Sequence, residues 1–224
     1  FQNKNVSMSP YKILCMLLLL AVVSCDMKGR RMDQESIREE KKNREIKRVR
    51  EVDVLNAALE KGRSVVGVAQ RELLNTLQQA IDQHGVAGAV EYCNVQALPL
   101  MDSLSQAGNV NVRRVSHRFR NPEDKPGEVE VQLLNAYDYS IEQNEDPGDN
   151  IQMLDNGKIL YTKPIVINTP LCLNCHGAEN MIAADTRARI EQLYPQDKAT
   201  GFEQGDLRGM WSIELEKKEI IKEM

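Results

Sequence analysis

The most reactive side chains of this chain gather in one short run, Cys172-Leu173-Asn174-Cys175-His176. Two cysteines two residues apart, followed directly by a histidine, form the attachment motif for a c-type haem. The two thiols would add across the vinyl groups of the porphyrin, and the imidazole would bind the iron. The run therefore predicts one covalently attached haem c, with His176 as an iron ligand.

Two other chemistries use similar residues. A structural zinc site needs four ligands, and the sequence has no second Cys/His pair at short spacing. A thioredoxin-like dithiol would follow a strand in a βαβ unit, whereas this run follows Thr169-Pro170 with no such unit around it. Both alternatives are weaker than haem attachment.

The N-terminus indicates where the protein works. Lys12 precedes an apolar stretch, residues 13–24, that is too short to span a bilayer and has the size of a signal-peptide core. The stretch ends in Val22-Val23-Ser24-Cys25, which resembles a bacterial lipobox, so residues 1–25 are expected to be a signal peptide with Cys25 as the lipidated residue. The alternative is ordinary cleavage with an unmodified Cys25, and the true start could be Met8.

Around the motif, the sequence predicts helices first and a sheet later. Residues 26–51 are dense in charge and read as a partly helical tether. Apolar residues at helical intervals predict one or two helices over 52–84, stopped by Gly85, and a further helix from Val86 to about Gly108. Cys93 falls on the apolar stripe of that further helix, so it is predicted to face the core.

The remaining residues alternate between strands and short helices. Strands are predicted at 109–119, 151–154, 158–167 and 209–215, with a hairpin turn at Asn156-Gly157. Helices are predicted from Pro126 to about Ile141, at 182–193, and in the charged tail at 216–224. Without βαβ alternation, this order predicts an α+β fold with an antiparallel sheet, flanking helices and a long N-terminal helical arm.

Composition sets one limit on function. The 224 residues carry a net charge of -4 with 28% charged residues, which argues against nucleic-acid binding because that requires a concentrated basic surface.

The order and spacing of several short blocks resemble a bacterial c-type haem domain family with a PAS-like fold, found in cyanobacterial proteins, in sensor kinases and as stand-alone exported proteins. The resemblance covers residues 52–215, taken as the haem domain. The blocks are Glu91-Tyr92-Cys93-Asn94, Val112-Arg113-Arg114-Val115-Ser116, Arg120-Asn121-Pro122, Tyr161-x-Lys163-Pro164-Ile165, the haem run with Gly177, Gly201-Phe202, and Gly205-Asp206-x-Arg208-Gly209.

The resemblance implies an unusual pair of axial ligands, His176 on the proximal side and Cys93 on the distal side. A thiolate stabilises Fe(III), lowers the reduction potential and can detach when the iron is reduced. His117 is the main rival for the distal position. Four methionines could bind the iron through their thioether sulfur, but methionine more often fills gaps in apolar cores. They are Met101, Met153, Met181 and Met210. His84 is expected at the surface.

A group of arginines offers partners for the two haem propionates, since buried carboxylates need charge-assisted hydrogen bonds. The candidates are Arg113, Arg114, Arg120 and Asn121, with Arg208 and Lys163 as weaker ones. The alternative is that these side chains only cap a turn and face water.

These inferences predict an exported, lipid-anchored haem c protein on the periplasmic side of a bacterial membrane. Its expected role is sensing of redox state or of a diatomic gas by ligand exchange, with the signal passed to another protein. An electron-transfer cytochrome is the alternative, and a haem enzyme such as a peroxidase is a weaker one, so no enzymatic activity is expected.

Overall fold

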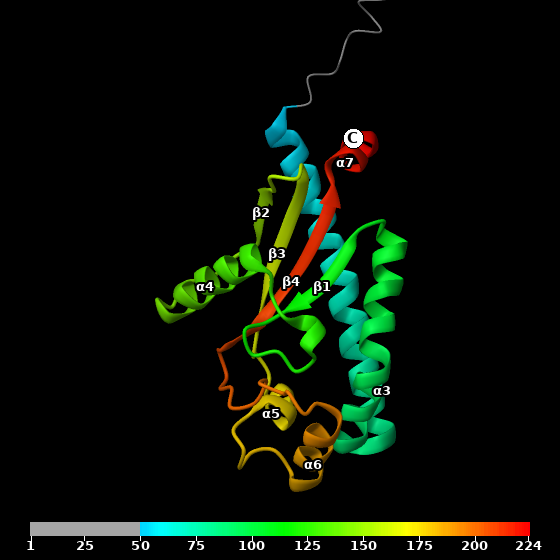
Figure 1. Cartoon of the computed structure of the whole chain (residues 1–224), viewed down its shortest axis with the longest axis vertical. Coiled ribbons are helices and arrows are strands. Elements are labelled where there is room, and N and C mark those ends of the chain that lie inside the picture. The colour runs from blue at the N-terminus through cyan, green and yellow to red at the C-terminus, as the bar shows by residue number, and fades with distance from the viewer. Residues whose placement is uncertain (1–49) are drawn as a thin grey trace, which may run out of the picture. The chain divides into compact units, whose positions relative to one another are not determined.

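A long helix begins the part of the chain that the computed structural model describes, residues 50–224, with the side chains of 93–98 outside the description. This helix, α3 (Glu51–Gly108), is interrupted at Gly85, whose φ of 72° is readily available only to glycine. The two limbs fold back on each other (Figure 1). The second limb ends at Asn109, whose left-handed backbone caps the helix.

Four strands form one antiparallel sheet: β1 (Asn111–Val115), β2 (Asn150–Met153), β3 (Lys158–Val166) and β4 (Leu207–Glu216). Their order in the sheet is β1-β4-β3-β2, so the last strand lies in the middle and pairs with the first. The hairpin predicted at Asn156-Gly157 is confirmed, with Gly157 at φ 78°. β1 is shorter than predicted and ends at Val115.

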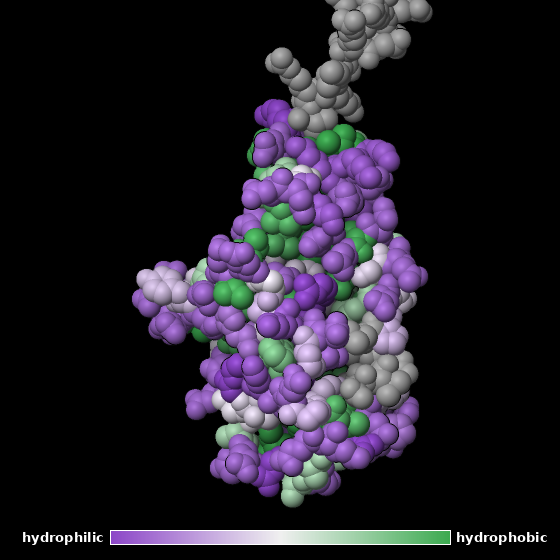
Figure 2. Space-filling view, in the orientation of Figure 1, coloured by the Kyte–Doolittle hydropathy of each residue, from purple (hydrophilic) through white to green (hydrophobic). Residues whose placement is uncertain are grey.

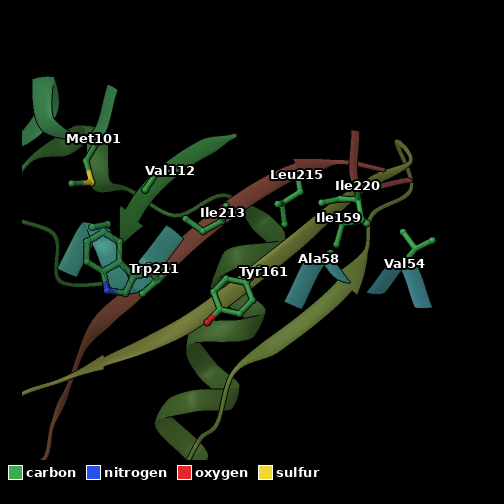
Figure 3. Close-up of a cluster of buried hydrophobic side chains, with 12 residues drawn as sticks. Val54, Ala58, Met101, Val112, Ile159, Tyr161, Trp211, Ile213, Leu215 and Ile220 are labelled. Atoms are coloured by element: carbon green, nitrogen blue, oxygen red, sulfur yellow. The ribbon is translucent and has the colours of Figure 1, made fainter. Parts of the chain in front are cut away.

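The first limb of α3 covers one face of the sheet and builds the main core (Figure 3). Ala58 on the helix is fully buried, as are Tyr161 and Ile213 on the strands beneath it. Gly62 lets the helix approach very closely, because an added Cβ there would lie 2.3 Å from the Tyr161 ring.

Helix α4 (Glu128–Glu142) packs across the other face (Figure 1). Leu134 and Tyr137 are buried there beside Val115 and Met210. The Tyr137 hydroxyl lies 2.7 Å from the hydroxyl of Thr162 on β3. The helix begins two residues after Pro126 instead of at it, because Glu130 accepts the Gly127 N–H and caps the start.

The smaller helices lie at the two ends of the sheet. The 3-10 helix η1 (Pro122–Asp124) follows β1, and α5 (Pro170–His176) and α6 (Ala184–Leu193) lie beyond the end where β4 begins (Figure 1). Helix α7 (Lys217–Glu223), predicted as a charged tail, lies beside the start of α3 and buries Ile220 in the main core.

The α+β class, the antiparallel sheet with flanking helices and the long N-terminal helix are confirmed. Hydrophilic residues cover most of the face shown in Figure 2, where apolar residues form small separate patches. Within residues 50–224, none of the helices combines the length and apolar character required to cross a membrane. The predicted signal peptide, Cys25 and nearly all of the 26–51 tether lie outside the described residues.

Candidate functional site

The Cys-x-x-Cys-His run forms the short helix α5. Thr169 caps it, since its hydroxyl oxygen accepts the Leu171 N–H at 3.1 Å, and Pro170 occupies the first helical position. Both are favourable residues for these positions. The helix places Cys172 and Cys175 three residues apart, so both thiols lie along the same side.

The two cysteines pack into different apolar clusters. Cys172 contacts the cluster of Ile167, Ala199 and Phe202. Cys175 contacts a cluster of Val90 on α3, Ile182 just before α6 and Ile190 within α6. The run is therefore enclosed between α3, α6 and the loop that precedes β4.

His176 is held by that loop, residues 197–206. Its Nδ1 lies 2.7 Å from the carbonyl oxygen of Ala199, and its own carbonyl accepts the Phe202 N–H at 2.9 Å. The Phe202 ring lies edge-on to the imidazole, with 6.2 Å between centroids. The described residues supply no hydrogen bond to Nε2, so this nitrogen is the one available to a metal.

The surroundings of His176 favour the neutral imidazole. Burial lowers its pKa well below the usual value, and the guanidinium groups of Arg208 and Arg120 lower the pKa further. A neutral imidazole with Nδ1 hydrogen-bonded to a carbonyl is the usual arrangement of a metal-binding histidine.

Arg114 and Arg208 bring positive charge to the same region. Both are close enough to His176 to lower its pKa. The Nε of each is buried without a hydrogen-bond partner in the described part of the chain. Burial lowers the pKa of the Arg208 guanidinium to about 10, and the neighbouring Arg120 and Arg114 act in the same direction. Because buried donors are normally paired, these two nitrogens fit an added anion such as a carboxylate.

Two other predicted anion partners are engaged in structural contacts. Arg113 lies on the opposite face of β1 from Arg114, where it forms an ion pair with Glu130 of α4 at 3.2 Å. Asn121 caps η1 by accepting the Glu123 N–H. Lys163, a weaker candidate, stands in the same row of the sheet as Arg114, since both are paired with Trp211.

Arg120 is close to the site but has partners within the protein. It forms a two-pronged ion pair with Asp197 and also reaches the carbonyl oxygens of Cys175 and Ala199. Asp197 and Ala199 have no motif in the sequence that marks them as site residues, and only the contacts reveal them.

Cys93, the predicted distal ligand, belongs to α3, and its side chain lies outside the described residues. Val90, three positions earlier on this helix, packs in the same cluster as Cys175. The second limb of α3 therefore passes beside α5 close to position 93.

The rival ligands are placed elsewhere. His117 is exposed, and its Nε2 lies 2.8 Å from the amide oxygen of Asn135 on α4. Met101 is buried in the main core, Met153 is partly buried against it, and Met210 is buried beneath α4. Met181 and His84 are exposed. Among the described side chains, no group of three His, Cys, Asp or Glu residues converges to hold a metal ion, as a zinc site would require.

Comparison with known proteins identifies the family. The chain belongs to the Tll0287-like family, whose model matches residues 34–215. The chain is also similar to a solved structure, described as the crystal structure of the cyanobacterial heme-protein Tll0287. That similarity has 28% sequence identity and a TM-score of 0.46, and it covers 65% of this chain and 95% of the other. No curated protein sequence matches. The family resemblance seen in the sequence blocks is thus confirmed, while c-type attachment and a PAS-like fold stay predictions.

Proposed function

We propose that this chain is a haem c protein that binds one haem through Cys172 and Cys175, with His176 as the proximal iron ligand. The observation that carries the proposal is the hydrogen bond from His176 Nδ1 to Ala199, which leaves Nε2 for the metal directly after the two cysteines. Membership of a family whose relative is described as a heme-protein supports it. Bound haem would supply an iron that changes between Fe(III) and Fe(II) and exchanges a ligand.

The protein's own residues have separate tasks in this proposal. Cys172 and Cys175 would form the thioether links, and Ala199 would keep the imidazole in the tautomer that presents Nε2. Arg114 and Arg208 would pair with the propionates, because each has a buried Nε without a partner in the described residues. Cys93 would bind on the distal side.

Within this framework we propose that the protein senses redox state or a diatomic gas by release of Cys93. Export and lipid attachment at Cys25 belong to the same proposal, since c-type haem is attached outside the cytoplasmic membrane. The signal would pass to another protein, and no catalytic role is proposed. An electron-transfer cytochrome is the second candidate.

Haem attachment is tested by producing the protein with a haem c maturation system and extracting it with acidic acetone. We expect wild type to keep its haem and Cys172→Ala/Cys175→Ala to lose it to the solvent, because only thioether links resist extraction. Loss of all haem from wild type would contradict the proposal.

The distal ligand is tested by ferric and dithionite-reduced absorption spectra of wild type beside Cys93→Ser. We expect the substitution to convert a low-spin ferric spectrum towards high spin, because serine is a poor iron ligand. Identical spectra would mean that another residue binds the iron.

CO binding then separates the two functions: a ligand-exchange sensor takes up CO in the ferrous state, whereas a carrier with two permanent ligands resists it.

A further inference from the structure

Arg120 and Asp197 form a two-pronged ion pair close to His176. The Nε of Arg120 lies 3.2 Å from one Asp197 oxygen, and Nη2 lies 3.2 Å from the other. Both side chains are largely buried, at 12% and 9% exposure, so water screens their charges little.

The pair also acts on the carbonyl that orients His176. Arg120 Nη2 lies 3.3 Å from the Ala199 oxygen, the same oxygen that accepts from His176 Nδ1. Asp197 in turn accepts the Ala199 N–H at 2.9 Å. The two members of the ion pair therefore bind the two backbone polar groups of Ala199, its C=O and its N–H.

Arg120 reaches the attachment helix as well. Its Nη2 lies 2.6 Å from the carbonyl oxygen of Cys175, the residue before His176. One guanidinium thus connects the segment after β1, the end of α5 and the loop before β4, and its position determines how strongly Ala199 can accept from the imidazole.

We propose that Arg120 and Asp197 are positioning residues that set the reduction potential of an iron bound to His176, acting through the Ala199 carbonyl; this inference rests on the proposed haem site. The more strongly Ala199 accepts from Nδ1, the more electron density the imidazole donates and the more Fe(III) is stabilised. Arg120 shares the carbonyl and weakens that hydrogen bond.

Arg120 and Asp197 must then shift the reduction potential of the iron in opposite directions. Removing Arg120 frees the carbonyl for His176 and removes a positive charge, and both changes favour Fe(III). Removing the charge of Asp197 releases Arg120 towards Ala199 and takes away a negative charge, and both changes favour Fe(II). A purely structural role would not produce opposite signs, and an effect of charge alone would leave Arg120→Lys at the wild-type potential.

The experiment measures the midpoint potential of the haem-loaded full chain by spectroelectrochemical titration. We expect Arg120→Gln to lower the potential and Asp197→Asn to raise it. The potential of Arg120→Lys should fall between those of wild type and Arg120→Gln, because lysine keeps the charge but cannot form all the hydrogen bonds of the guanidinium group. Arg187→Gln is the control: it breaks an ion pair at the surface between Arg187 of α6 and Glu179, which precedes that helix, and it should leave the potential unchanged.

Three results would overturn the inference: shifts of the same sign in Arg120→Gln and Asp197→Asn, shifts no larger than that of the control, or an Arg120→Lys potential equal to that of wild type. If Arg120→Gln gives no folded holoprotein, Arg120→Lys and Asp197→Asn provide the same test: the first should lower the potential and the second should raise it. Failure of the proposed function is distinguishable, because it appears already in wild type as absence of covalent haem.

Discussion

At the scale of single residues, the composition of the site depends on which of two adjacent arginines in β1 points towards His176. Arg113 and Arg114 are adjacent in β1, so their side chains point to opposite faces of the sheet. Arg113 is neutralised by Glu130, whereas the buried Nε of Arg114 has no hydrogen-bond partner in the described part of the chain. Two residues that looked equivalent in the sequence therefore have different expected roles.

This difference can be tested with haem and its dimethyl ester, which lacks the propionate charges. In a Cys172→Ala/Cys175→Ala background that binds haem only without covalent links, we expect Arg114→Gln and Arg208→Gln each to reduce the preference for haem over the ester about tenfold. That corresponds to the loss of a charge-assisted hydrogen bond. Spectroscopic titration of the apoprotein measures both affinities.

Arg113→Gln is the matched control in the same strand. It should lower stability, because Glu130 loses its cation, but it should leave the ratio of the two affinities unchanged. An equal effect of Arg113→Gln and Arg114→Gln on that ratio would rule out the assignment.

At the scale of elements, α3 and the sheet approach so closely at position 62 that only glycine fits there. Gly62 faces the fully buried ring of Tyr161, and an added Cβ would lie 2.3 Å from its Cγ. Neither the ring nor the helix backbone can move without disturbing the main core. The approach of α3 to β3 is thus determined by the absence of a side chain at position 62.

We expect Gly62→Ala to lower the free energy of unfolding by at least about 1–3 kcal/mol, the usual cost of overpacking a core. Gly67→Ala, in the same helix, should instead raise it by about 0.5–1 kcal/mol, because alanine is the better helix former. At Gly67 an added Cβ meets only the far end of Arg71, at 3.9 Å. Urea denaturation of both variants gives the comparison, and equal effects would refute the packing argument.

At the scale of the whole described unit, residues distant in the chain complete one core. Ile220 of α7 is 2% exposed and packs in the cluster that contains Val54 and Ala58 of α3. Lys61 and Glu223 add an ion pair at 2.6 Å between the same two helices. The last helix therefore helps to hold the first one against the sheet.

We expect Ile220→Ala to cost about 2–5 kcal/mol of stability, as large-to-small substitutions in cores do. The neighbouring Ile221 is 38% exposed, and its replacement by alanine should cost about 1 kcal/mol or less. Thermal and urea unfolding of the two variants would show whether α7 belongs to the cooperative unit; equal small losses would show that it does not.

The sequence by itself determined the features that depend on neighbours in the chain. Gly85 divides the long helix, Asn156-Gly157 makes the hairpin turn, and Cys172, Cys175 and His176 lie together because they are within one turn of each other. Backbone preferences and side-chain spacing act over a few residues, so a single sequence reveals them. The family resemblance added the expectation for Cys93, which stays a prediction.

Only the tertiary structure decided which distant groups meet. The Ala199 carbonyl that orients His176 comes from 23 residues further along the chain, and Arg120 is joined to Asp197 across 77 residues. His117 is exposed beside Asn135 of α4, and β1 ends at Val115, four residues before the boundary that the strand pattern had placed. Such contacts depend on how helices and loops pack on the sheet, which no local periodicity encodes.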